Sequence, residues 1–301
     1  MRILQVDDDP LVLRILTETL AHSGFKDCTS AKSVEEAVEV LSSSRRPFDC
    51  LLLDLNMGEV SGASLCRWLR KTEAYRTTPI IMVTGARRKL DIDHIFLAGA
   101  TDYISKPLDL NLLVQKLRKI QRDFAVLVDA SVGEKMSFNT PQVLGKIPAE
   151  AAISTVENYL LNVGRDEVGV HEAIAIVICK AAQLHFEVGP QRFSDLLRRI
   201  GRGIAKYLGP PNCMIAYAGN GALVCVTTST GNFTSDRTVI ARELVERLNL
   251  IGKRRYGQGS VRFECRIEGP KKLRAGPSQN AVDALYRLVV DAEFSCSGTV
   301  L

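Results

Sequence analysis

The first 123 residues alternate between short apolar runs and amphipathic segments, and this alternation limits the possible folds more than any other feature. The apolar runs have the length of strands, and the segments between them have helical spacing. We expect strands at 2–6, 25–30, 49–55, 79–85 and 101–105, and helices at 10–24, 33–44, 61–73, 91–100 and 108–123. Such a chain builds a doubly wound, parallel α/β sheet with helices on both faces.

Polar residues come directly at the ends of four of these strands. They are Asp7, Asp8 and Asp9, then Asp54, Thr84 and Lys106. Because the carboxyl ends of parallel strands meet along one edge, we expect these side chains to share one crevice. Clustered carboxylates repel one another unless a cation lies among them, and Mg²⁺ binds such oxygens while bridging to phosphate. Asp54 is then the natural nucleophile, since carboxylates form acyl phosphates.

The stretches "VDDD", "LLLDLNM", "VTGA" and "YISKP" give residues 1–121 a close resemblance to the CheY-like receiver domain of two-component response regulators. The resemblance implies a flavodoxin-like fold and phosphorylation of Asp54 by a sensor histidine kinase or a histidine phosphotransfer protein. It also implies a Mg²⁺ cofactor. Asp7 and Asp8 match the acidic pair, with Asp8, Asp54 and the backbone carbonyl of Asn56 as the direct ligands.

The same resemblance assigns roles to three further residues. Thr84 matches the switch hydroxyl that moves toward the phosphoryl group, and Tyr103 matches the aromatic residue that follows it. Lys106 matches the lysine that pairs with phosphate, and its bond to Pro107 is expected to be cis. Gly58 stands where that family usually carries proline, a departure that removes no ligand.

The second half of the chain has a different order of elements. We expect helices at 149–164, 191–209, 236–252 and 280–296, strands at 171–181 and 260–269, and a hairpin at 213–228. This is an α+β arrangement of the palm or ferredoxin-like kind. The predicted domains are therefore 1–122 and 149–301, joined by a linker at 123–148 whose first part extends the last helix of the first domain.

The hairpin "IAYAGNGAL" turns at Asn-Gly, which favours a type I′ turn. Its sequence and the order of elements are similar to the GGDEF domain of diguanylate cyclases, whose hairpin turn binds GTP. The corresponding turn here is Ala218, Gly219, Asn220, Gly221 and Ala222. The expected carboxylates are missing, because Val177 replaces the strand aspartate and Asn220 and Gly221 replace the two acids of the turn. His185 and Ser194 stand at the guanine- and ribose-contacting positions, and an RxxD motif is absent at 209–212. An unrelated α+β domain with a common Asn-Gly turn is the alternative.

These observations predict a response regulator whose degenerate GGDEF-like domain has lost cyclase activity and signals by binding a protein or by changing dimer contacts. The alternative is a response regulator that is an active or nucleotide-binding diguanylate cyclase. A transcriptional output is disfavoured, because no helix-turn-helix follows residue 130 and the net charge of +5 is scattered, so we expect no DNA partner.

Three further expectations concern the surroundings and surface of the chain. No apolar run is long enough to span a bilayer, so we expect a cytoplasmic protein without a membrane partner. Its eight cysteines form no CxxC pair and should be reduced thiols. A face of mixed charge suits a homodimer, although a solvated surface explains it equally well. Its charged residues are Arg87, Arg88, Lys89, Lys116, Arg118 and Lys119, with Asp91, Asp93, Asp102 and Asp109.

Overall fold

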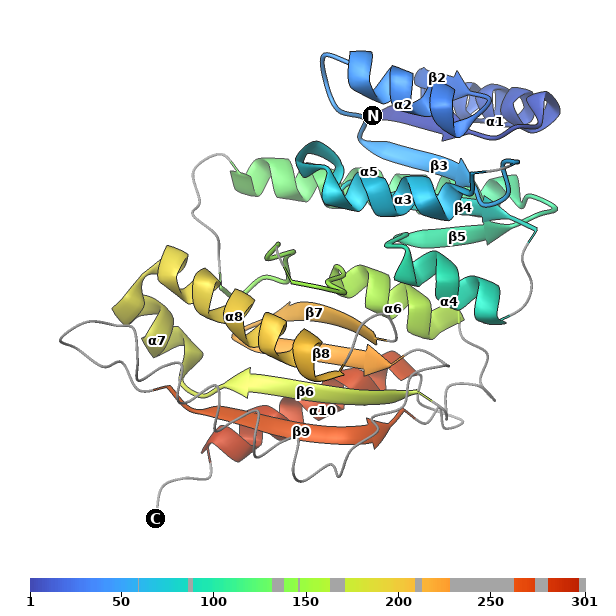
Figure 1. The fold of residues 1–301 in the computed structure, drawn as a ribbon. Coiled ribbons are helices and arrows are strands. Elements are labelled where there is room, and N and C mark those ends of the chain that lie inside the picture. Colours follow the sequence, from blue (N-terminus) through green and yellow to red (C-terminus); the bar gives the residue numbers. More distant parts are fainter. Residues whose placement is uncertain are drawn as a thin grey trace. The chain divides into compact units, whose positions relative to one another are not determined.

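The computed structural model describes residues 1–58, 60–85, 89–131, 138–145, 147–162, 171–208, 213–227, 263–273 and 281–297. The chain divides into two compact units, Met1–Glu134 and Lys135–Leu301 (Figure 1). Each unit has its own sheet and its own buried core. No helix within the described residues is both long enough and apolar enough to cross a membrane.

The first unit is a parallel sheet of five strands in the order β2-β1-β3-β4-β5. The strands are β1 (Arg2–Val6), β2 (Asp27–Ala31), β3 (Cys50–Asp54), β4 (Ile80–Thr84) and β5 (Asp102–Ser105). The helices are α1 (Pro10–His22), α2 (Val34–Ser43), α3 (Gly62–Lys71), α4 (Lys89–Leu97) and α5 (Leu110–Ser131), with a short 3₁₀ turn at Glu73–Tyr75. The predicted flavodoxin-like architecture is confirmed.

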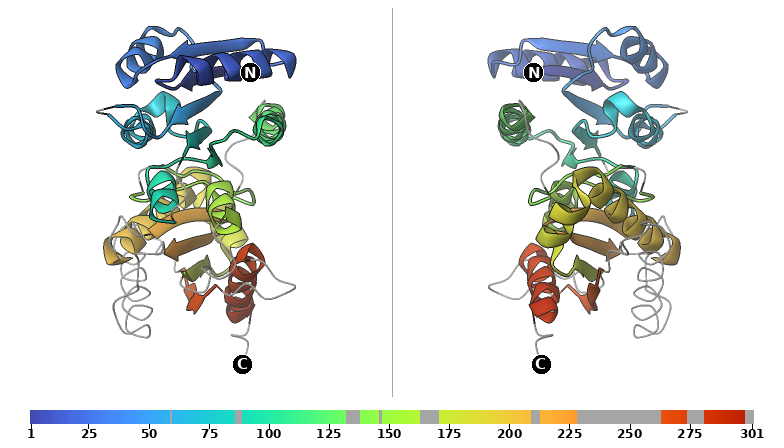
Figure 2. Two further views of the ribbon diagram at one scale, coloured as in Figure 1. Left: turned by 90° about the vertical axis from the view of Figure 1, so that its right-hand side faces the viewer. Right: turned by 90° about the vertical axis from the view of Figure 1, so that its left-hand side faces the viewer.

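Helices cover both faces of this sheet, as the alternating pattern requires. One buried cluster joins the sheet to α1 and α5 through residues such as Leu16 and Leu113. The other joins it to α2, α3 and α4 through residues such as Ala37, Leu65 and Ile95. Figure 2 shows α3 and α4 on one side of the strands and α5 on the other. The strand ends therefore remain the natural place for a site.

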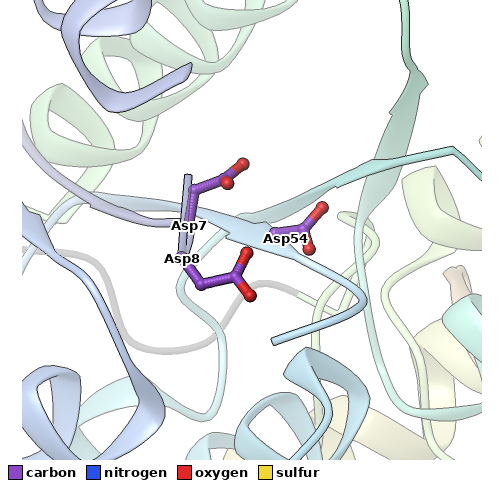
Figure 3. Close-up of side chains that lie close together, drawn as sticks. All are labelled: Asp7, Asp8 and Asp54. Atoms are coloured by element: carbon purple, nitrogen blue, oxygen red, sulfur yellow. The ribbon is translucent and has the colours of Figure 1, made fainter. Parts of the chain in front are cut away.

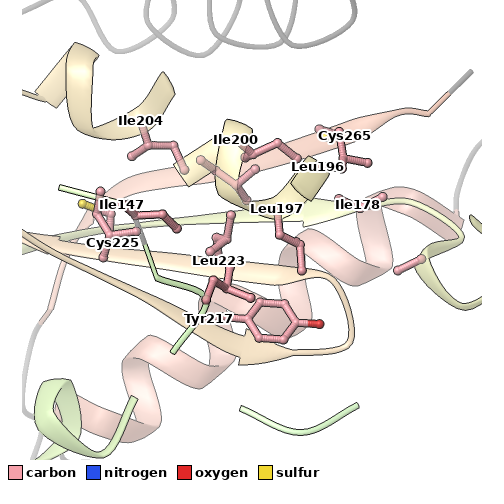
Figure 4. Close-up of a cluster of buried hydrophobic side chains, with 14 of the residues drawn as sticks. Ile147, Ile178, Leu196, Leu197, Ile200, Ile204, Tyr217, Leu223, Cys225 and Cys265 are labelled. Atoms are coloured by element: carbon pink, nitrogen blue, oxygen red, sulfur yellow. The ribbon is translucent and has the colours of Figure 1, made fainter. Parts of the chain in front are cut away.

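The second unit has an antiparallel sheet of four strands in the order β7-β8-β6-β9. The strands are β6 (Glu172–Ile178), β7 (Cys213–Gly219), β8 (Ala222–Thr227) and β9 (Cys265–Lys272). The described helices are α6 (Ile153–Asn162), α7 (Ala181–Val188), α8 (Pro190–Leu208) and α10 (Ala281–Ser297). The main core lies between the sheet and α8, where Leu197 and Ile200 meet Leu223 and Tyr217 (Figure 4).

Some sequence expectations change in this unit. Helix α7 was not predicted. Gly189, which has a φ of 81°, separates it from α8, and the sequence predicted only the second of these helices. The predicted helix at 236–252 lies outside the described residues. Residues 138–145 and 147–148, predicted as part of a linker, belong to the second unit, where Gln142 forms a β-bridge with Tyr217.

The expectation that every cysteine is a free thiol is wrong for one pair. Cys179, directly after β6, forms a disulfide with Cys296 on α10, across 117 residues of sequence. No local spacing rule could indicate a pairing over that distance. The other six cysteines are free, and burial raises the pKa of Cys50 and Cys265 to about 12, which keeps those thiols protonated.

Candidate functional site

Three carboxylates meet at the carboxyl edge of the parallel sheet. Asp7 and Asp8 follow β1 and Asp54 ends β3, and one oxygen from each lies within 4.8 Å of the others (Figure 3). Asp7 and Asp54 are buried, whereas Asp8 is exposed. The cluster therefore has two fixed members at its base and one at its opening, and the structure brings together the acids predicted to form the site.

Lys106 connects the two buried acids. Its Nζ lies 2.9 Å from Asp7 Oδ2 and 2.9 Å from Asp54 Oδ1. Burial lowers the pKa of Lys106, but the hydrogen bonds and charges of the two carboxylates outweigh this and raise it overall. Counted as formal charges, three carboxylates and one ammonium sum to −2, which a divalent cation with oxygen ligands could neutralise.

The pKa of Asp54 is raised above its ordinary value. Burial raises its pKa, and the nearby charge of Asp7 raises it further, while Lys106 and the Asn56 amide act in the opposite direction. The Asn56 N–H donates to Asp54 Oδ2 over 2.9 Å and restrains the carboxylate in one orientation. A second amide, that of Asp9, donates to Asp7 Oδ1 over 3.0 Å.

Two glycines shape the loop after Asp54. A Cβ at Gly62 would lie 1.9 Å from the Asp54 carbonyl oxygen, so only glycine allows α3 to begin there. The sequence did not indicate this role of Gly62, because the close approach is to the backbone carbonyl of Asp54 rather than to a side chain. Gly58 has a φ of 66°, a value that proline cannot adopt, so this loop could not carry proline without changing its path.

The ends of β4 and β5 complete the edge. Thr84 is fully buried, and its carbonyl oxygen accepts a hydrogen bond of 2.7 Å from the Lys106 N–H. The Lys106–Pro107 bond is cis, as the resemblance implies. The half-buried Tyr103 packs edge-on against Phe96, with 6.1 Å between ring centroids. Thr84 thus ends β4, whereas Tyr103 is the second residue of β5 and pairs with Met82 of β4.

The family model described as the response regulator receiver domain matches residues 3–118. Over 120 residues the chain is 32% identical to chemotaxis protein CheY1 of Helicobacter pylori, covering 40% of this chain and 96% of that protein. The chain belongs to the response regulator receiver family. Chemotaxis protein CheY of Pseudomonas aeruginosa is 33% identical over 120 residues, covering 40% of this chain and 95% of its own. The solved structure of Vibrio cholerae CheY4 is 26% identical, covers 40% of this chain and 97% of its own, and has a TM-score of 0.37. We refer to the first unit below as the receiver unit.

The mixed-charge face of the receiver unit differs from its prediction. Asp93 and Asp102 are buried, and Lys116 forms an ion pair with Asp102 rather than presenting its charge outward. We expected both acids to lie with the charged residues of the surface, but their burial depends on how α4 and β5 pack. Arg87 and Arg88 lie outside the described residues. The predicted charge pattern for a self-complementary face is therefore wrong at these positions.

The hairpin of the second unit forms the predicted tight turn. Asn220 and Gly221 have φ values of 52° and 81°, and Gly219 pairs with Ala222 across them, as a two-residue type I′ turn requires. The Gly221 N–H donates to the hydroxyl of Tyr217 over 3.1 Å. In the described part of the chain, Asp7, Asp8 and Asp54 form the single group of three or more potential metal ligands, so no such group lies at this turn.

The other two positions compared with a nucleotide site are close to aromatic rings. His185 stacks on Phe138, with 4.8 Å between ring centroids, and meets Phe193 edge-on at 5.3 Å. The Nε2 of His185 and the Oγ of Ser194 are buried and have no hydrogen-bond partner among the described residues. Buried polar atoms without partners are rare, and they indicate a place where a bound group could add hydrogen bonds. The 209–212 positions lie outside the described residues.

Proposed function

We propose that this chain is a two-component response regulator that is phosphorylated on Asp54 and acts in the cytoplasm. A sensor histidine kinase or a histidine phosphotransfer protein would supply the phosphoryl group. The observation that carries the proposal is the contact of Lys106 with both Asp7 and Asp54, which leaves the exposed Asp8 beside a site of net negative charge. In this arrangement a nucleophile, an acidic pair and a phosphate-pairing cation lie together.

The residues of the chain supply the following steps. The Asn56 amide restrains Asp54 Oδ2, so Oδ1 is the oxygen expected to attack phosphorus, breaking the bond between phosphorus and its donor nitrogen or oxygen. Lys106 then pairs with a phosphoryl oxygen instead of the free carboxylate. Asp8, Asp54 and the backbone carbonyl of Asn56 would hold Mg²⁺ beside Asp7. When bound, the ion neutralises the charge that phosphate brings to the carboxylates.

Labelling with acetyl phosphate in the presence of Mg²⁺ tests the nucleophile. The Asp54→Asn chain should acquire no phosphoryl mass, because the amide cannot form an acyl phosphate. The matched control is Asp27→Asn, an exposed aspartate on the edge strand β2, which should label like the natural chain. If Asp54→Asn labels as fully as the control, the assignment of the nucleophile is wrong.

For the second unit we propose a degenerate GGDEF-like output without cyclase activity, acting by protein binding or by altered dimer contacts. Two features support this. The order β7-β8-β6-β9 places the first strand between the third and the last, as in palm and ferredoxin-like sheets. Val177, Asn220 and Gly221 offer no carboxylate, and loss of metal ligands removes the transition-state stabilisation that joining two GTP molecules needs.

The test is to incubate the phosphorylated full chain with GTP and Mg²⁺ and to measure cyclic di-GMP by mass spectrometry. We expect no product above a heat-denatured control. Light scattering with and without beryllofluoride separates the two modes of output, because a dimer switch raises the mass and binding of another protein leaves it unchanged. Cyclic di-GMP above the control would replace this proposal with an active cyclase.

A second candidate is nucleotide binding without turnover. The unpartnered Nε2 of His185 and Oγ of Ser194 favour it, since both atoms could bond to a heterocyclic base. Calorimetric titration with GTP tests this candidate, and His185→Phe should abolish the heat if the base binds there.

A further inference from the structure

The edge strand β7 is covered along its free edge by residues that precede α6 in the chain. Gln142 bridges to Tyr217 in an antiparallel sense, and Glu150 bridges to Ile215 in a parallel sense. The Ile215 N–H donates to Ala149 O over 2.9 Å. The covering segment thus pairs with the edge through backbone atoms, much as an added strand would.

The second part of this segment, residues 144–145 and 147–151, is held firmly, and we call it the anchor. Leu144 and Ile147 are buried in the core beneath α8. The Glu150 carboxylate accepts hydrogen bonds from the Leu144 and Gly145 amides, and Arg198 Nε donates to Leu144 O over 2.7 Å. Leaving the unit would expose apolar side chains and break charged hydrogen bonds, so the anchor should stay in place.

The first part, residues 138–143, contains no buried residue, and we call it the strap. The carbonyl oxygen of Phe138 accepts hydrogen bonds from the Asn220 N–H, over 2.8 Å, and from the Tyr217 hydroxyl. The Phe138 ring stacks on His185, as described above. Asn139, Thr140 and Pro141 are exposed. Segments with little buried apolar surface open at low free-energy cost.

The turn is shaped to receive a backbone rather than a side chain. A Cβ at Gly219 would lie 2.5 Å from the Asn139 carbonyl oxygen, so glycine is what allows the strap to approach the turn. The strap therefore uses three features of the unit: a close backbone approach at Gly219, two donors for one carbonyl, and an aromatic slot formed by His185 and Phe193.

We infer that the strap is a displaceable internal ligand, and that the surface beneath it binds an extended peptide segment of a partner protein through an aromatic side chain. This rests on the proposed protein-binding output of the second unit. An edge strand with a side-chain slot is the geometry by which extended peptides add to sheets.

The connection to the receiver unit supports a regulatory role for this surface. Residues 132–137 alone separate the end of α5 from the strap along the chain. A change in α5 on phosphorylation can therefore reach the strap through few residues, while the anchor keeps the rest of the unit unchanged. Phosphorylation should thus raise the population in which the strap is open.

Peptide binding to the full chain tests the surface itself. The probes are a fluorescent peptide with the strap sequence MSFNTPQVLG and the same peptide with tyrosine in place of phenylalanine. Phe138→Ala, which removes the internal competitor, should bind both at least about tenfold more tightly than the natural chain. Adding His185→Ala should abolish the gain, whereas adding Phe186→Ala, an exposed residue of the same helix, should preserve it.

Hydrogen exchange on the natural chain tests displacement without any variant. Asn220 donates its N–H to the strap and Ile215 donates to the anchor, so the second amide is the internal control for the first. Beryllofluoride should accelerate exchange at Asn220 and leave Ile215 unchanged. Equal exchange at both amides in both states overturns the displacement.

The outcomes separate this inference from the proposed function. Failure of Phe138→Ala to bind either peptide, with the thermal unfolding midpoint retained, overturns the inference even when Asp54 labels normally. Failure of labelling at Asp54 overturns its assignment as the phosphorylated residue but does not affect the peptide result, because Phe138→Ala opens the surface without phosphorylation.

Discussion

The acidic edge of the receiver unit and the hairpin turn of the second unit are both places where strands end, yet they are built in opposite ways. At the first, Asp7 and Asp54 are buried around one lysine, and charge repulsion leaves a site that a cation and a phosphate can stabilise. At the second, the amides of the neutral turn donate to partners from the same chain, Asn220 to the Phe138 carbonyl oxygen and Gly221 to the Tyr217 hydroxyl. A strand end can bind a ligand or react when its charged groups lack counter-charges. It has a structural role when a neighbouring segment supplies hydrogen-bond partners for its polar groups.

The disulfide should produce the largest difference between the two units. Reduction with dithiothreitol should lower the free energy of unfolding of the second unit by about 4 to 5 kcal/mol, because a bond across 117 residues restrains a long loop of the unfolded chain. Urea unfolding followed by circular dichroism measures the effect. Fluorescence of Trp68, the one tryptophan of the chain, reports the receiver unit and should not shift.

The Cys179→Ser chain is the control for this experiment. It should unfold like the reduced natural chain and should not respond to dithiothreitol. A shift of the Trp68 transition on reduction would contradict independent stabilisation of the two units.

Close backbone packing at Asp54 should produce the next largest effect. Gly62→Ala should lower the free energy of unfolding of the receiver unit by about 3 kcal/mol, because the added Cβ meets the Asp54 carbonyl oxygen and forces α3 to move. The same variant should label slowly with acetyl phosphate. Gly85→Ala is the matched control, since a Cβ there meets nothing within 4 Å. Comparable losses for the two variants would show that glycine flexibility, rather than the close contact, is responsible.

Removing the central cation of the receiver site should have an intermediate effect. Lys106→Met should cost about 2 kcal/mol of unfolding free energy without metal, because two charged hydrogen bonds are lost and the carboxylates repel each other. Millimolar Mg²⁺ should restore most of the loss, which urea titrations with and without the ion would measure. Lys119→Met, on the exposed side of α5, should change neither value. If Mg²⁺ does not raise the unfolding free energy of the Lys106→Met chain, these acids do not form a cation site.

The pH dependence of stability should show the smallest effect. The folded-state pKa of Asp54 lies above its ordinary value of 3.8, so ionising this carboxyl costs the folded state free energy. Without metal, Asp54→Asn should equal the natural chain in stability below the ordinary pKa. It should exceed the natural chain progressively as the pH rises through the raised pKa. Thermal unfolding of the receiver unit between the acid range and neutrality measures this difference, and a natural chain that is the more stable one at neutral pH would contradict the sign.

The two units also differ in how far the sequence predicts them. In the receiver unit the apolar strands are local signals, and the polar residues that follow them converge because parallel strands share an edge. The sequence alone therefore places Asp7, Asp54 and Lys106 together. The burial of Asp93 and Asp102 could not be predicted in this way, because it depends on how α4 and β5 pack.

The second unit depends more on contacts between distant residues. The Asn220–Gly221 turn is a local signal and was predicted with its type. The disulfide from Cys179 to Cys296 and the cover over β7 join residues far apart in sequence, and no periodicity records them. The stretch after α5 is rich in polar and turn-forming residues, which indicates a linker. The side chains of Leu144 and Ile147, near its end, are nevertheless buried in the core.

The covered edge of β7 has a consequence for self-association. The opposite edge strand, β9, carries Pro270 and the exposed Lys271 and Lys272, residues that discourage pairing with another chain. Strand β7, with the sequence CMIAYAG, carries no proline or charged residue, and its edge is covered by the strap and the anchor. A molecule with the strap open presents unpaired backbone groups beside apolar side chains. The activated protein should therefore aggregate at high concentration, unless a partner peptide binds the open edge of β7 first.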